Sequence, residues 1–185
     1  MKRLIAVFLM LFVLCGCSSN SALDSAMKLR EKLLNGNGCE FQAIITADYG
    51  DKLYSFSVAC KADTAGRVDF TVLKPESIQG ISGYISADGG NLTFDDEVLS
   101  FAMIADGQIT PVSAPWLFIR TLQGGYIKGC ATTEEGMHLQ IDDSYLEDAM
   151  QVDVFTDSSI IPTRTEFLWR GRRILSMDIE CFTFA

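Results

Sequence analysis

The chain contains one histidine, and its setting does not favour catalysis. His138 lies between Met137 and Leu139 in a stretch with the alternation of a strand, and no Gly-x-Ser-x-Gly or similar nucleophile motif occurs in the sequence. Nucleophilic catalysis needs a base within reach of its nucleophile, so a lone histidine here indicates a structural side chain. The sequence therefore predicts a protein that is not an enzyme and that uses no cofactor.

Two acidic clusters and one basic cluster are the other polar groups that could bind a ligand. The acidic clusters, Asp95-Asp96-Glu97 and residues 142–148, have neither the spacing nor the glycine of an EF-hand calcium loop, so we interpret them as solvated turns. With one histidine and no Cys-x-x-Cys pair beyond the leader, no metal site is expected. The basic cluster, residues 169–173, could contact an anionic headgroup, but we favour a hairpin tip there.

Four cysteines follow residue 17 and could form disulfides: Cys39, Cys60, Cys130 and Cys181. If residues 48–51 form a hairpin loop, Cys39 lies opposite Cys60, and directly opposed strand residues are ~4.5–5.5 Å apart, within bridging distance. Cys130 and Cys181 would then pair with each other. Four cysteines allow three pairings, and four free buried thiols are the alternative.

The first seventeen residues combine the features of an export signal that ends at a modifiable cysteine. Lys2 and Arg3 precede an apolar run over residues 4–14, which has the length of a signal-peptide core and about half of the ~20 residues that span a membrane. The run ends in Leu14-Cys15-Gly16-Cys17, which is similar to the bacterial lipobox. This likeness implies removal of residues 1–16 and diacylation of Cys17. A plain secretory signal and an uncleaved anchor are the alternatives.

Charge and composition limit the expected partners. The chain of 185 residues has 48% hydrophobic and 21% charged residues, as in a globular domain, and we place that domain at residues 21–185 after a short tether over residues 17–20. The formal net charge of −9 disfavours nucleic acid as a partner. We expect an extracytoplasmic protein that is anchored to the cell membrane, or to the outer membrane in a Gram-negative cell, by acyl chains.

The expected elements are one helix followed by a long antiparallel meander. Residues 21–34 have helical periodicity and stop at Asn35-Gly36-Asn37-Gly38, so this helix should bury one face. Its expected stripe is Leu23, Met27, Arg30 and Leu34, widened by Ala26, Leu29 and Leu33. Period-two alternation then predicts strands at residues 39–47, 52–61, 67–73, 78–86, 91–94, 98–104, 126–131, 137–141, 150–156, 163–169 and 173–184.

One segment interrupts the meander. Pro115 precedes the apolar residues 116–122, and Gly124-Gly125 follow them. Proline in the first turn and glycine after the last turn are typical start and stop signals of a short helix. Because the segment is apolar nearly all round, we expect it to be buried against the hollow face of a curved sheet. Another buried strand is the alternative.

This order of elements resembles the LolA/LolB lipoprotein-carrier fold, and three short phrases support the likeness. They are Lys74-Pro75-Glu76, the residues Gly89-Gly90-Asn91-Leu92-Thr93-Phe94-Asp95, and the final pair Pro162-Thr163-Arg164-Thr165-Glu166 and Arg173-Ile174-Leu175-Ser176. The resemblance, to a lipid-anchored Gram-positive branch, implies an α+β, mostly β fold. It would be a curved antiparallel half-barrel with an N-terminal helix and a short helix on its concave face.

The resemblance also implies a concave apolar surface beside a membrane. Neither the gating arginine of the soluble carrier nor the protruding loop of the membrane-bound acceptor can be placed, so no binding residue is transferred. We expect an acyl chain, a lipid, another hydrophobic ligand or a lipoprotein as cargo. The predicted lining is Tyr84, Phe94, Phe101, Trp116, Phe118 and Leu122, although these residues could instead fill an ordinary core. An envelope protein-interaction or sensing module without a small ligand is the alternative function.

Overall fold

The computed structural model describes residues 19–94, 97–98 and 109–185. The expected signal peptide, Cys17, Phe101 and the side chain of Phe94 lie outside this part of the chain. Among the described residues, no helix combines the length and hydrophobicity that crossing a bilayer would require.

The strands of the described residues form one antiparallel sheet. Its strands are β1 (Cys39–Asp48), β2 (Leu53–Ala62), β3 (Val68–Lys74), β4 (Ser82–Ser86), β5 (Gly89–Phe94), β6 (Glu97–Val98), β7 (Tyr126–Thr132), β8 (Gly136–Asp142), β9 (Gln151–Asp157), β10 (Pro162–Trp169) and β11 (Arg172–Phe184). They lie in the order β6-β5-β4-β3-β2-β1-β11-β10-β9-β8-β7. Two meanders are therefore joined by the pairing of β1 with β11, and the expected antiparallel meander is confirmed.

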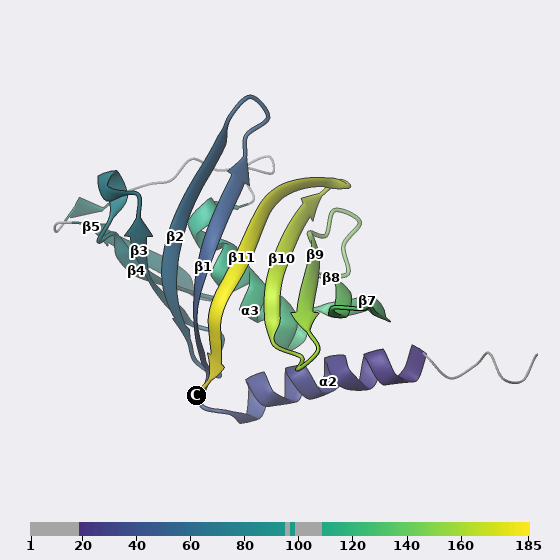
Figure 1. The fold of residues 1–185 in the computed structure, drawn as a ribbon. Helices are drawn as coiled ribbons and strands as arrows, with labels where there is room; N and C mark the ends of the chain where they lie inside the picture. Colours follow the sequence, from purple (N-terminus) through teal and green to yellow (C-terminus); the bar gives the residue numbers. More distant parts are fainter. Residues whose placement is uncertain (1–18, 95–96, 99–108) are drawn as a thin grey trace, which may run out of the picture.

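The sheet curves around α3 (Ala114–Gly124), as Figure 1 shows. α3 contacts β2 and β3 from one meander and β8 from the other, so it fills the concave side. Strand alternation explains why this side is the core: in β1, Ala43 and Ile45 are buried, whereas Gln42 and Ile44 are exposed. The expected half-barrel with a short buried helix is therefore present.

The N-terminal helix α2 (Ser19–Asn35) lies across the lower end of the strands in Figure 1. The buried face of α2 is rotated about the helix axis relative to the expected stripe. The buried residues of α2 are Ala22, Ala26, Leu29 and Leu33, whereas Leu23, Met27 and Leu34 are exposed. The residues expected only to widen the stripe form its buried centre, because small alanines allow α2 to approach the sheet and α3 closely.

Arg30 joins α2 to the end of α3. Its Nε donates to the Leu122 carbonyl at 2.7 Å, and its Nη2 donates to the Gly125 carbonyl at 2.7 Å. The last carbonyls of a helix have no partner within the helix, and a cation at this end also interacts favourably with the helix dipole. Burial lowers the pKa of Arg30, and Tyr145 acts in the opposite direction.

The β1–β2 hairpin has a different register from the one expected. Its loop is residues 49–52, closed by a 3.0 Å hydrogen bond from Tyr49 N to Lys52 O, one residue later than predicted. Cys39 is therefore opposite Ala62, and Cys60 is opposite Phe41. Because the shift moves each partner by two residues, the buried faces are unchanged and only the pairings differ.

Candidate functional site

An apolar cleft lies at the free end of the β1–β2 hairpin, which projects beyond its neighbours in Figure 1. The hairpin tip is held in place by Asp48, which accepts a 2.7 Å hydrogen bond from Gly50 N and lies 3.0 Å from Arg172 Nη2. These contacts lower the pKa of Asp48, with the backbone bond first and the guanidinium second. Gly50 has a φ of 93°, a conformation that favours glycine.

We call this cleft the hairpin cleft, and its volume is about 520 Å³. β1 and β2 supply one wall, and the 3-10 helices η2 (Glu76–Ile78) and η3 (Pro111–Ser113) contribute residues to the other. The lining residues are Ala47, Tyr49, Asp51, Lys52, Tyr54, Ser55, Phe56, Pro75, Ser77, Ile78 and Pro111. Most of these side chains are apolar or aromatic, and the volume is within the usual range for small-molecule sites.

Two tyrosines contribute the aromatic surface of the hairpin cleft. The rings of Tyr49 and Tyr54 meet edge to face with centroids 5.5 Å apart. Burial, and secondarily Tyr54, raise the pKa of Tyr49, so its hydroxyl is neutral at physiological pH. The charged groups that line the cleft are Asp51 and Lys52, both exposed in the hairpin loop. This arrangement suits a ligand with an apolar body and a polar end.

A second cleft, the tryptophan cleft, lies between α3 and the β8–β9 connection and also has a volume of about 520 Å³. Trp116 and Trp169 line it, and the Arg120 guanidinium lies 5.1 Å from the Trp116 ring centroid. The Trp169 indole nitrogen is buried and has no hydrogen-bond partner. Asp143 and Asp148 make this cleft more polar than the hairpin cleft, so an acyl chain fits it less well.

The structure separates the predicted lining residues. Trp116 lines the tryptophan cleft, whereas Phe118 and Leu122 are buried in the core. Tyr84 is on the outer face of the sheet, because it pairs with the exposed Asp69. Its ring lies 3.9 Å from the Arg67 guanidinium. The structure therefore does not bring the described members together around one cavity, and ligand binding by any of them stays a prediction.

The hairpin cleft was not predicted from the sequence, because residues 48–51 were interpreted only as a hairpin loop and the residues after them only as a strand. The available signal was aromatic: Tyr49, Tyr54 and Phe56 flank one turn. Pro75 and Ile78 come from a separate connection, after β3. Their approach to the hairpin depends on the tertiary fold, which a local sequence pattern does not reveal.

The predicted disulfides are absent from the described part of the chain, where all four cysteines are free thiols. Cys39 and Cys60 are diagonal rather than opposed neighbours. Cys130 in β7 and Cys181 in β11 are four strand positions apart, about 19 Å along the sheet, which a disulfide cannot span. Burial raises the pKa of Cys39 to about 12 and raises that of Cys60 as well, so both thiols stay protonated.

The single histidine contacts an aspartate and a phenylalanine. His138 Nε2 lies 3.2 Å from Asp153 Oδ2, and its ring stacks on Phe155 with centroids 4.5 Å apart. The other Asp153 oxygen accepts a 2.8 Å hydrogen bond from Gln151. Across residues 19–94, 97–98 and 109–185, no group of three His, Cys, Asp or Glu side chains is placed to hold a metal ion.

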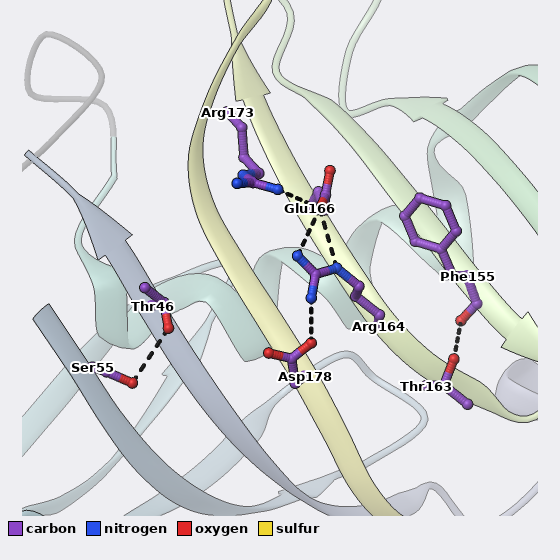
Figure 2. A network of polar contacts seen from close by, with 8 residues as sticks. All are labelled: Thr46, Ser55, Phe155, Thr163, Arg164, Glu166, Arg173 and Asp178. Carbon is purple, nitrogen blue, oxygen red and sulfur yellow. Dashed lines mark hydrogen bonds and ion pairs between the residues drawn. The ribbon is translucent and has the colours of Figure 1, made fainter. Parts of the chain in front are cut away.

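The basic cluster forms a hairpin tip whose cations face carboxylates and a ring. Figure 2 shows the network on the outer face: Arg173 donates to Glu166 at 2.7 Å, and Arg164 bridges Glu166 and Asp178. Burial raises the pKa of Glu166, but the hydrogen bonds from the two arginines outweigh burial and lower it overall. These cations are therefore already paired within the protein, which disfavours an anion site here.

The curved sheet with α3 on its concave side is the architecture that the resemblance to the LolA/LolB carriers implied. No protein-family model matches the chain, and no curated protein matches its sequence.

Solved structures similar to this chain include three with the following descriptions. An uncharacterized conserved protein from Thermus thermophilus is 15% identical over 88% of this chain and 87% of its own, with a TM-score of 0.48. A LolA superfamily protein from Nitrosomonas europaea is 11% identical over 92% of this chain and 94% of its own, with a TM-score of 0.46. A putative outer membrane lipoprotein-sorting protein domain from Vibrio parahaemolyticus is 8% identical over 89% of this chain and 92% of its own, with a TM-score of 0.42. At these identities the likeness concerns the fold alone.

Proposed function

We propose that this chain is a membrane-anchored, non-enzymatic lipoprotein that binds an acyl chain, a lipid or another hydrophobic ligand. In this proposal residues 1–16 are removed as a signal peptide, Cys17 carries the acyl chains, and residues 21–185 form one extracytoplasmic domain. Two acyl chains give a stable anchor where one gives a marginal one. The hydrophobic ligand occupies the hairpin cleft.

The observation that carries the proposal is the composition of the hairpin cleft. Tyr49, Tyr54, Phe56 and Ile78 converge on about 520 Å³ of space at the open end of the sheet. Moving an apolar ligand from water onto such a surface is favourable by ~25 cal/mol per Å² of apolar area that is buried. Lys52, exposed in the hairpin loop, could meet a carboxylate or phosphate at the polar end of the ligand.

Binding is tested by filling the cleft. Ser77, an exposed residue of η2, lines the hairpin cleft, so Ser77→Trp should occupy part of its volume without disturbing the core. Ser159→Trp, in the exposed β9–β10 turn, is the matched control. We expect a fluorescent fatty acid to bind the unsubstituted protein and S159W equally, and S77W more weakly. Equal affinity for all three proteins, or no binding to any of them, contradicts a ligand in this cleft.

The anchor is tested separately by metabolic labelling with radioactive palmitate. Cys17→Ala should abolish labelling, whereas Cys15→Ala removes a neighbouring cysteine and should leave labelling in place. Persistent labelling of C17A would refute the lipid attachment at Cys17 and would leave the ligand-binding test unaffected.

A protein-interaction module is the second candidate function. It is favoured by the exposed apolar side chains of Leu53 and Tyr54 at the start of β2, beside the hairpin cleft. Cross-linking from Tyr54→Cys in intact membranes should then recover one defined protein. Recovery of lipid alone favours the first function.

A further inference from the structure

The helix α2 carries two apolar stripes, and only one of them is buried. Ala22, Ala26, Leu29 and Leu33 pack against the domain. The second stripe, which we call the outer stripe, consists of Leu23, Met27 and Leu34, with 43%, 49% and 46% of their surfaces exposed. At 100° per residue these three side chains fall within a narrow sector of the helix. A contiguous exposed apolar stripe of this kind is a candidate interaction surface.

Two tyrosines continue this surface beyond α2. Tyr126, at the start of β7, and Tyr145, in the β8–β9 connection, lie with ring centroids 5.3 Å apart, and Tyr145 is 88% exposed. Both are tied to the outer stripe through Arg30, which lies between Met27 and Leu34 along the helix. Arg30 bonds the Gly125 carbonyl, next to Tyr126, and interacts electrostatically with Tyr145. Tyrosine is enriched at membrane–water interfaces, and leucine is common on the lipid-facing side of helices that lie in the interface.

We propose that the outer stripe and the two tyrosines seat α2 on the lipid bilayer that holds the protein, parallel to its surface. This proposal rests on the anchor at Cys17 that the proposed function includes. α2 begins at Ser19, two residues after Cys17, so an acylated Cys17 places the first turn of the helix within ~7 Å of the anchored residue. The short connection makes the helix–lipid contact effectively intramolecular, so a small apolar stripe suffices.

The charges of α2 indicate which lipid surface suits it. Asp24 and Glu31 border one side of the outer stripe, and Lys28 and Lys32 lie further around the helix. Arg30 borders the other side, but its guanidinium is bonded to the carbonyls of Leu122 and Gly125 at the end of α3. Carboxylates nearest the lipid disfavour an anionic surface. We therefore assign an uncharged or zwitterionic headgroup region to this face.

The test compares two adjacent positions of the acylated full-length protein in phosphatidylcholine vesicles. Met27→Trp places an indole on the outer stripe, and Lys28→Trp places one about 100° around the helix at nearly the same distance from the anchor. Emission of the unsubstituted protein is subtracted to remove Trp116 and Trp169. We expect brominated phosphatidylcholine to quench the added indole of M27W and to leave that of K28W bright. Unchanged urea midpoints confirm that both variants fold.

The outcomes separate this proposal from the proposed function. Equal quenching of the two indoles, or quenching of neither, in protein whose acylation is verified by mass overturns the seating of α2 and leaves the anchor intact. Absence of the acyl chains refutes the anchor itself. A concentration-dependent dimer that M27W disrupts assigns the outer stripe to a second copy of the chain and also overturns the proposal.

Discussion

The bond between Arg30 and the end of α3 connects the two helices and can be broken with one substitution. The guanidinium donates to two carbonyls, those of Leu122 and Gly125, each at 2.7 Å. Arg30→Met removes both bonds and the charge while keeping most of the aliphatic stem that packs beside α3. The two carbonyls then lose the cation that satisfies them at a partly buried helix end.

The expected loss follows from the type of bond. A hydrogen bond to a charged group contributes about 1.5–3 kcal/mol, and the interaction of a cation with a helix C-terminus contributes about 0.3–1 kcal/mol. Both bonds come from one side chain and the site is partly exposed, so water replaces part of the loss and the contributions do not add. We expect R30M to lower the free energy of unfolding by about 2–3 kcal/mol.

Urea denaturation followed by circular dichroism measures this loss. With an m-value of about 2 kcal/mol per M, the midpoint should fall by about 1–1.5 M at constant m. Lys28→Met is the matched control, because Lys28 is an exposed cation of the same helix, and its effect should stay within about 0.5 kcal/mol. Equal midpoints for R30M and K28M would show that the two bonds do not stabilise the fold.

Three further results are expected. In urea denaturation, Leu29→Ala should lower the free energy of unfolding by about 2–5 kcal/mol, and Leu23→Ala should lower it by less than about 0.5 kcal/mol. A larger loss for Leu23→Ala would show that the other face of α2 is in the core. Because the pKa of Glu166 is held below its ordinary 4.5, this carboxylate contributes stability above that pH, which is lost as pH falls through the folded-state pKa. Glu166→Gln should be less stable near neutral pH and lose less stability on acidification, and an unchanged acid limb in thermal melts would contradict the network. Iodoacetamide should alkylate the exposed Cys181 of the native protein before the buried Cys60. An intact mass that shows the loss of two hydrogens for each disulfide would refute free thiols.

Local alternation was sufficient to locate the strands. Each strand of the described chain overlaps an expected segment, because side chains alternate between core and solvent wherever one face of a sheet is buried. β4 begins at Ser82 rather than at residue 78, because Ile78 belongs to η2, and β6 shares only Val98 with its expected segment. Pro115 and the glycines after residue 123 likewise marked the ends of α3, since proline suits a first helical turn and glycine interrupts a helix. The lipobox-like ending at Cys17 is also a local signal, and it stays a prediction.

Local patterns did not determine which neighbours meet. A hairpin loop one residue later than expected leaves every strand face unchanged, yet it moves Cys39 from Cys60 to Ala62. The two apolar stripes of α2 are equally helical in sequence, and only the approach of small alanines to the sheet decided that Leu29 is buried and Met27 exposed. The hairpin cleft depends on Pro75 and Ile78 reaching Tyr54 across the fold.

The sequence alone determined the mostly β character, the alternation of buried and exposed side chains along the strands and the ends of the short helix, because each depends on residues within a few positions of one another. The tertiary structure decided the register of the first hairpin, the buried side of α2 and the position of the apolar cleft. Those features depend on contacts between segments that are far apart in the chain. Such contacts form only when the whole domain folds, so no local pattern reveals them.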